Sequence, residues 1–165
     1  MTTKLTNIVF MRHGNAFSKH ENGVSFDSER TLSPLGQKNT LTSAQKLKSL
    51  NFSPDSIISS PFVRAVQTAE IVSATFKKKE IQILNELATP NSISSLLEIL
   101  LKKGKAGKSL IAIGHMPTVN LLAELIIPKT AFHFNPAGFA YIQINTKDFL
   151  ENPKNYGNLI EFFNI

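Results

Sequence analysis

The feature that most constrains the fold is a short apolar run that stops abruptly at a cation and an imidazole. Residues 8–11 are Ile-Val-Phe-Met, and Arg12, His13 and Gly14 follow directly. A continuous apolar run of this kind is typical of a strand buried in a parallel sheet. The glycine lets the backbone turn tightly or lets another group come close. Open α/β sheets bind ligands at the carboxyl ends of their strands, so the run predicts a functional strand end.

Two later segments end in the same way. After the predicted strand 56–59, Arg64 falls in the first turn of a helix. The clearest buried strand, residues 109–114, ends directly at His115. The carboxyl ends of parallel strands lie at one edge of a sheet, so these side chains are expected to converge. The four residues expected to meet are Arg12, His13, Arg64 and His115.

Helix starts are marked by serine and proline. Ser33-Pro34 and Ser60-Pro61 each predict an N-cap followed by proline at the first helical position. Asn91 or Ser92 is expected to cap a further helix, and Pro117 to open another. The polar stretch 15–31 is predicted to be a surface loop. The predicted strands are residues 8–11, 56–59, 81–84, 109–114, 138–144 and 158–163.

This alternation of strands and helices predicts the fold class. The 165 residues suffice for one domain, spanning 1–165, with a sizeable core. Repeated βα units predict an α/β three-layer sandwich with a mostly parallel central sheet flanked by helices.

Composition excludes several kinds of site and partner. The chain has no cysteine, which excludes disulfides, zinc–thiolate sites and thiol catalysis. Its apolar runs are too short for a membrane helix, and its N-terminus lacks the apolar region of a secretory signal, so a cytoplasmic location is expected. The net charge of +6 favours anionic partners. The lysine clusters at 77–79 and 102–108 contain no aromatic residues, so we interpret them as solvated loops and expect no nucleic acid partner.

The chemistry expected at the common edge is anion binding. Helix N-termini carry unpaired N–H groups and a partial positive charge, and the forks of Arg12 and Arg64 match phosphate oxygens. We therefore predict a pocket for a phosphoryl group. Ordinary alternatives remain for each residue. Arg64 could pair with Glu70 or with a loop acid at the surface, and His115 could be a buried histidine that donates to a backbone carbonyl.

The motifs resemble those of the histidine phosphatase superfamily, the phosphoglycerate-mutase-like proteins. They follow the family's order and span the whole chain. The short length and the small gap between Leu84 and His115 are similar to the SixA branch, the phosphohistidine phosphatases. The matching segments are Arg12-His13-Gly14, Leu32-Ser33 with Gly36, residues 60–69, and Gly114-His115.

The resemblance implies a phosphatase that uses neither metal nor cofactor. His13 would attack phosphorus and become phosphohistidine, and the nearby arginines disfavour its charged form. Arg12, Arg64 and His115 would hold the equatorial oxygens, so no metal is needed. Gly14 and Asn15 would also bind the phosphate.

The proton donor and the substrate are less determined. Glu86 is the first choice as general acid, and Asp27 and Glu29 are alternatives. No counterpart of the capping insertions of larger relatives is present, so the pocket is expected to be open and to suit a phosphorylated protein. The expected substrate is phosphohistidine on a signalling protein. The chain itself is expected to be a monomer. A small-molecule phosphomonoesterase and a non-catalytic phosphoprotein-binding module are the alternatives.

Overall fold

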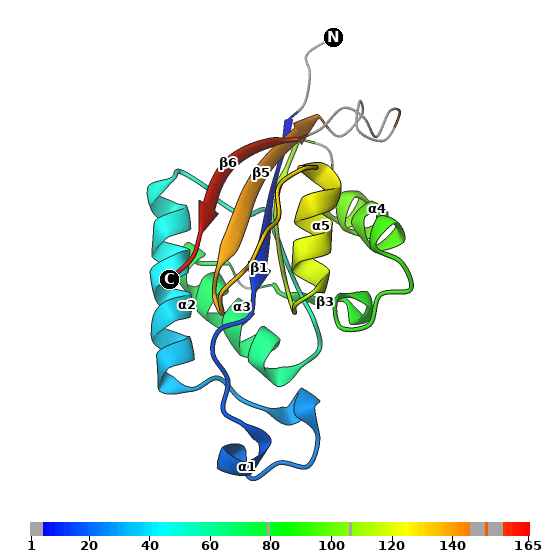
Figure 1. Ribbon diagram of the computed structural model, residues 1–165. Coiled ribbons are helices and arrows are strands. Elements are labelled where there is room, and N and C mark those ends of the chain that lie inside the picture. The colour runs from blue at the N-terminus through cyan, green and yellow to red at the C-terminus, as the bar shows by residue number, and fades with distance from the viewer. Residues whose placement is uncertain (1–4, 79, 106, 146–150, 152–156) are drawn as a thin grey trace.

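The computed structural model describes residues 5–78, 80–105, 107–145, 151 and 157–165. These residues form a twisted sheet with helices on both faces (Figure 1), which confirms the predicted α/β class. The sheet order within this part of the chain is β3-β2-β4-β1-β5-β6. The strands are β1 (Leu5–Arg12), β2 (Ser56–Ser59), β3 (Gln82–Ile83), β4 (Ser109–Gly114), β5 (Phe139–Asn145) and β6 (Asn158–Phe163).

The sheet is parallel from β3 to β1 and antiparallel at its other side. β1 and β2 both pair in parallel with β4, and β3 pairs in parallel with β2. β5 runs antiparallel to β1, and β6 runs antiparallel to β5. β3 is an edge strand, but it is shorter than the predicted 81–84.

The central strands are buried on both faces, which explains why they are continuously apolar. Along β1, Ile8 and Phe10 pack on one side, and Val9 and Met11 pack on the other. The first face is covered by α4 (Ile93–Gly104) and α5 (Thr118–Ile126). The second is covered by α2 (Pro34–Ser49) and α3 (Val63–Phe76). Among the described helices, none is both long and apolar enough to cross a membrane.

Most of the predicted helix starts are confirmed, with one exception. The Ser33 hydroxyl caps α2 by accepting from the Gly36 amide, and Ser92 caps α4 in the same way. The start predicted at Ser60-Pro61 is wrong, because α3 begins at Val63. The Ser60 side chain is bonded to His115 instead of capping the helix.

The polar stretch 15–31 is not simply a loop, so that prediction was incomplete. It contains the short helix α1 (Lys19–Asn22) and the 3-10 turn η1 (Asp27–Glu29). A capping box between Ser18 and Glu21 stabilises α1. A second 3-10 turn, η2 (Asn85–Leu87), follows β3.

A close backbone approach joins the end of β1 to the first turn of α2. A Cβ added at Gly36 would lie directly against the Asn15 carbonyl oxygen, and a Cβ added at Gly14 would lie 2.7 Å from the Gly36 oxygen. The Asn15 carbonyl is also the acceptor of the Ser33 amide, at 2.9 Å. The segment after β1 therefore has little freedom to move away from α2.

We predict that Gly36→Ala destabilises the protein by about 1–3 kcal/mol or more, because the added methyl group meets backbone and not a flexible side chain. Alanine normally stabilises a helix relative to glycine, so the sign of the change is diagnostic. Urea unfolding measures it, with Gln37→Ala, at an exposed neighbouring position, as the control. Unchanged or increased stability of Gly36→Ala would contradict the close approach.

Candidate active site

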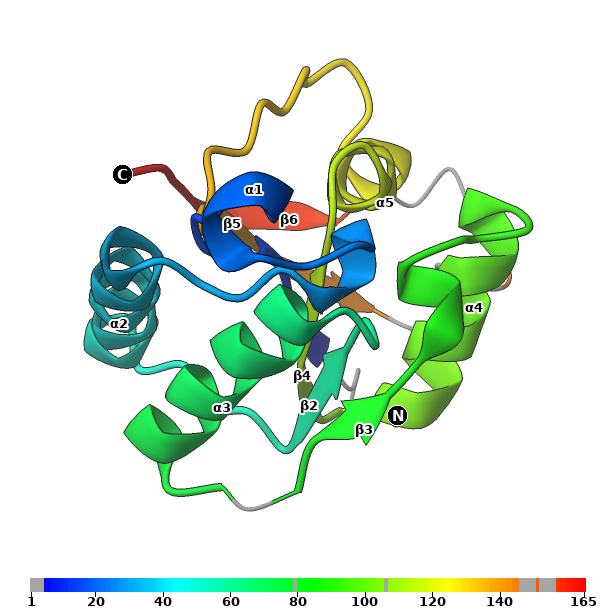
Figure 2. The same cartoon turned by 90° about the horizontal axis from the view of Figure 1, so that it is seen from below.

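A cavity of about 350 Å³ opens at the carboxyl edge of the parallel strands. Figure 2 looks onto this edge, where α1 lies in front of the strand ends. The four residues predicted to converge all line the cavity. Its polar lining consists of Arg12, His13, Asn15, Arg30, Arg64 and His115.

His13 is held as a neutral imidazole with a defined tautomer. Its Nδ1–H donates to the Gly14 carbonyl at 2.7 Å, because a carbonyl oxygen can only accept. Its Nε2 accepts from Arg64 Nε at 3.1 Å and therefore carries no proton. Burial lowers the pKa of His13 to about 3, and His115, Arg64 and Arg12 add to this, whereas the bond to Gly14 raises it. At neutral pH, Nε2 therefore carries a lone pair and no proton.

Arg64 is buried and fixed on several sides. Its Nη1 donates to the backbone oxygen of Asp27 at 2.6 Å, and its Nη2 to the Asp27 carboxylate at 2.8 Å. The guanidinium also lies over the Phe62 ring, 5.1 Å from the ring centroid. Of the two partners predicted for Arg64, a loop acid and Glu70, the structure shows the loop acid Asp27, but Arg64 itself is not at the surface, since it is only 6% exposed.

Arg12 and Arg30 complete a cationic lining. Arg12 Nη1 donates to the Phe134 carbonyl at 2.8 Å, while its buried Nε has no partner among the described residues. Burial and the nearby Arg64 lower the pKa of Arg12. Arg30 donates through Nη1 to the Asp27 carboxylate at 2.8 Å and through Nε to the Phe17 carbonyl. Sequence reasoning assigned Arg30 no role, although its three-residue spacing from Asp27 was a weak signal.

His115 faces His13, with the ring centroids 5.0 Å apart. Its Nε2 lies 2.7 Å from Ser60 Oγ, so its partner is this hydroxyl and not a backbone carbonyl as in the predicted alternative. Burial and the charge of Arg64 lower the pKa of His115 to about 4. The Phe62 ring packs against it at 4.8 Å between centroids. His115 is therefore a second neutral imidazole in the cavity.

Of the two backbone-turn residues predicted to bind phosphate, only Asn15 lines the cavity. The Gly14 amide donates to Thr68 Oγ1 at 3.1 Å, so it is already used within the protein. The Asn15 side chain accepts from Asn39 at 3.2 Å. Gly14 thus stabilises the turn through its amide and fixes the tautomer of His13 through its carbonyl.

No carboxylate is among the described residues that line this cavity. Glu86, the first choice as proton donor, lines a separate cavity of about 60 Å³ with Asn91 and Ser92. Glu29 accepts from the Phe26 amide at 3.0 Å. The hydrogen bond from Arg30 is the main reason why the pKa of Asp27 is lowered to about 2; burial opposes it, and the hydrogen bond from Arg64 adds a smaller lowering. Asp27 is therefore ionised at neutral pH and lies behind the arginines.

Known proteins are similar to this chain over most of its length. Residues 8–89 match the family model of the histidine phosphatase superfamily (branch 1). Phosphohistidine phosphatase SixA of Escherichia coli (strain K12) is 31% identical over 144 residues, which cover 84% of this chain and 85% of the relative. An uncharacterized protein of Picosynechococcus sp. is 32% identical over 130 residues, 78% of each chain. A solved structure of the protein histidine phosphatase SixA complexed with tungstate has a TM-score of 0.81 at 23% identity and covers 96% of both chains.

We predict that stability falls as the pH drops from 8 to 5. The pKa values of His13 and His115 are lowered to about 3 and about 4, so unfolding releases imidazoles that take up protons near their ordinary pKa of 6.5. The unfolded state binds more protons in this window, and the loss at pH 5 is about 2 kcal/mol per histidine.

Urea unfolding at both pH values measures this loss, and the double variant His13→Gln/His115→Gln is the control. The variant should lose most of the pH dependence. An equal dependence in the variant and the wild type would show that these imidazoles are not held neutral.

Proposed function

The chain belongs to the histidine phosphatase superfamily, in its SixA-type branch, and is a phosphatase; we propose that it removes the phosphoryl group from phosphohistidine on proteins, without a metal, through a phosphohistidine intermediate at His13. The observation that carries the proposal is the His13 imidazole, neutral and bonded so that Nε2 is the nucleophile, in a cavity lined by arginines.

In the first step, the Nε2 lone pair of His13 attacks phosphorus in line, and the N–P bond forms as the bond to the leaving group breaks. Once Nε2 is bonded to phosphorus, the Arg64 Nε–H, still held in place, donates to a phosphoryl oxygen. The Nδ1–H stays on the Gly14 carbonyl, which stabilises the positive charge that the ring acquires. In the second step, water attacks phosphorus and the N–P bond breaks; both protons of the water stay on the phosphate, which leaves as dihydrogen phosphate, and His13 is again neutral with its proton on Nδ1.

The arginines supply the electrostatic stabilisation. Charge spreads over the equatorial oxygens in phosphoryl transfer, and fixed guanidinium groups stabilise it without reorganising. Arg12, Arg30 and Arg64 all line the cavity. This cationic lining supports metal independence, and the described residues include no cluster of three His, Cys, Asp or Glu side chains that could hold a metal ion.

The substrate class follows from the leaving group. The described cavity lining contains no carboxylate that could protonate a departing alkoxide. An imidazole leaves phosphorus as a neutral molecule once solvent has protonated its other ring nitrogen, so phosphohistidine needs no dedicated acid. The likeness to phosphohistidine phosphatase SixA supports the same class.

We predict that His13→Ala lowers turnover on the order of 10³-fold or more, because it removes the nucleophile. Rapid acid-free quench with radiolabelled substrate should trap an acid-labile phosphoryl group on wild type and none on the variant. His20→Ala, at an exposed histidine of α1, is the matched control and should retain both properties. Labile phosphate on His13→Ala, at any other residue, would refute the assignment.

We also predict that, in the presence of EDTA, the enzyme prefers a phosphohistidine protein and phosphoramidate to sugar phosphates of similar size. A general acid contributes about 10²–10⁴-fold, so alkyl phosphates lacking one should be slower by about that factor. Glu86→Gln should leave phosphohistidine turnover within about twofold of wild type. Efficient sugar phosphate hydrolysis that Glu86→Gln abolishes would favour a small-molecule phosphomonoesterase with Glu86 as its acid.

A further inference from the structure

We propose that Asp27 is a positioning residue for phosphoryl transfer: it grips both terminal nitrogens of Arg64, so that Nε is the nitrogen of this guanidinium presented to the reacting phosphorus. The inference rests on the proposed function of the same cavity. Asp27 does not line the cavity itself. Its effect on the reaction therefore passes through the arginines that do.

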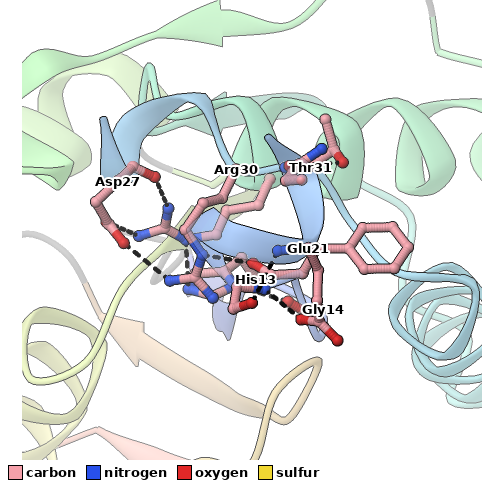
Figure 3. A network of polar contacts seen from close by, with 10 residues as sticks. His13, Gly14, Glu21, Asp27, Arg30 and Thr31 are labelled. Atoms are coloured by element: carbon pink, nitrogen blue, oxygen red, sulfur yellow. Dashed lines mark hydrogen bonds and ion pairs between the residues drawn. The ribbon is translucent and has the colours of Figure 1, made fainter. Parts of the chain in front are cut away.

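The nitrogens of the Arg64 guanidinium have different partners: the two terminal nitrogens contact Asp27, and Nε contacts His13. Nη1 and Nη2 are both bonded to Asp27, one to its backbone oxygen and one to its carboxylate, at 2.6 and 2.8 Å. Nε is the nitrogen of Arg64 that contacts the nucleophile, at 3.1 Å from His13 Nε2. Figure 3 shows this polar network from close by, with the labelled Asp27 and His13 lying apart from each other.

Asp27 also bridges two cations that would otherwise repel each other. One carboxylate oxygen accepts from Arg64 and the other from Arg30, both at 2.8 Å. An asparagine offers only one acceptor oxygen at this position, so it cannot replace both bonds. The bridge therefore sets the spacing of two guanidinium groups on one side of the cavity.

The segment that carries Asp27 is anchored independently of Arg64. Asn22, the last residue of α1, accepts from the Thr31 amide at 2.6 Å. The Leu32 amide donates to the side chain of Gln67 on α3, at 2.7 Å. Because its own backbone is tied to α1 and α3, Asp27 can impose a position on Arg64 instead of following it.

This grip bears on rate more than on stability. The Asp27 side chain is 53% exposed, and exposed ion pairs contribute little to folding. A donor that stabilises developing charge must be held within a small tolerance, because small displacements lower the rate steeply. Loosening Arg64 should therefore lower kcat. Removing the negative charge makes the cavity more cationic, so binding of a ground-state anion should not weaken.

The test is Asp27→Asn, with Glu29→Gln as the matched control. The control removes the same charge two residues away, where the side chain caps Phe26 and does not contact the cavity. For Asp27→Asn we expect kcat to fall about 10–10²-fold, while the inhibition constant of inorganic phosphate stays equal or decreases. Glu29→Gln should keep both values within about twofold of wild type. In an Arg64→Lys background, Asp27→Asn should add little further loss.

Three outcomes would overturn the inference. They are an unchanged kcat, a kcat that rises, and a kcat loss matched by weaker phosphate binding and a lower Tm. The last would mean that Asp27 only supports the local fold.

A readout without turnover separates this inference from the proposed function. The hydrogen exchange rate of the Arg64 Nε–H, followed by ¹⁵N NMR, should increase in Asp27→Asn and not in Glu29→Gln. If the wild type hydrolyses no phosphorylated substrate, the proposed function fails. In that case the exchange rate alone tests whether Asp27 positions Arg64: an increase in Asp27→Asn supports it, and an unchanged rate contradicts it.

Discussion

The parallel register between β1 and β4 is the constraint on which the site depends. Arg12 is paired with Gly114, and the His13 amide continues the ladder by donating to the Gly114 carbonyl at 3.0 Å. This register brings His13 and His115 to neighbouring strand ends. A slip by one residue would turn the side chains to the opposite face. The buried apolar side chains on both faces of β1 oppose such a slip.

The electrostatics of the cavity follow from unequal desolvation costs. An imidazole can lose its proton, so burial among cations leaves His13 and His115 neutral. A guanidinium keeps its charge in a protein and must therefore be given acceptors. Arg12 uses the Phe134 carbonyl and Arg64 uses Asp27. The same surroundings thus produce an uncharged imidazole at His13 and fixed positive charges beside it.

The segment between β1 and α2 does more than connect them, because it contributes residues to the site. Its 3-10 turn η1 supplies Asp27, and Arg30 follows directly, so two cavity arginines are organised from a stretch that has no apolar periodicity. The close approach of Gly36 to Asn15 anchors the start of this segment. The site therefore combines rigid strand ends with a turn whose path is held by hydrogen bonds.

The sequence alone determined the α/β class, the central strands and the convergence of Arg12, His13, Arg64 and His115, because these follow from apolar periodicity and from the common edge of parallel strands. Only the tertiary structure decided the roles of Ser60, Asp27 and Arg30, and the separation of Glu86 from the cavity. Those depend on contacts between distant segments. The Ser60 hydroxyl, which could cap a helix, is instead bonded to His115, 55 positions away. The local sequence pattern does not show which of these two partners the hydroxyl takes.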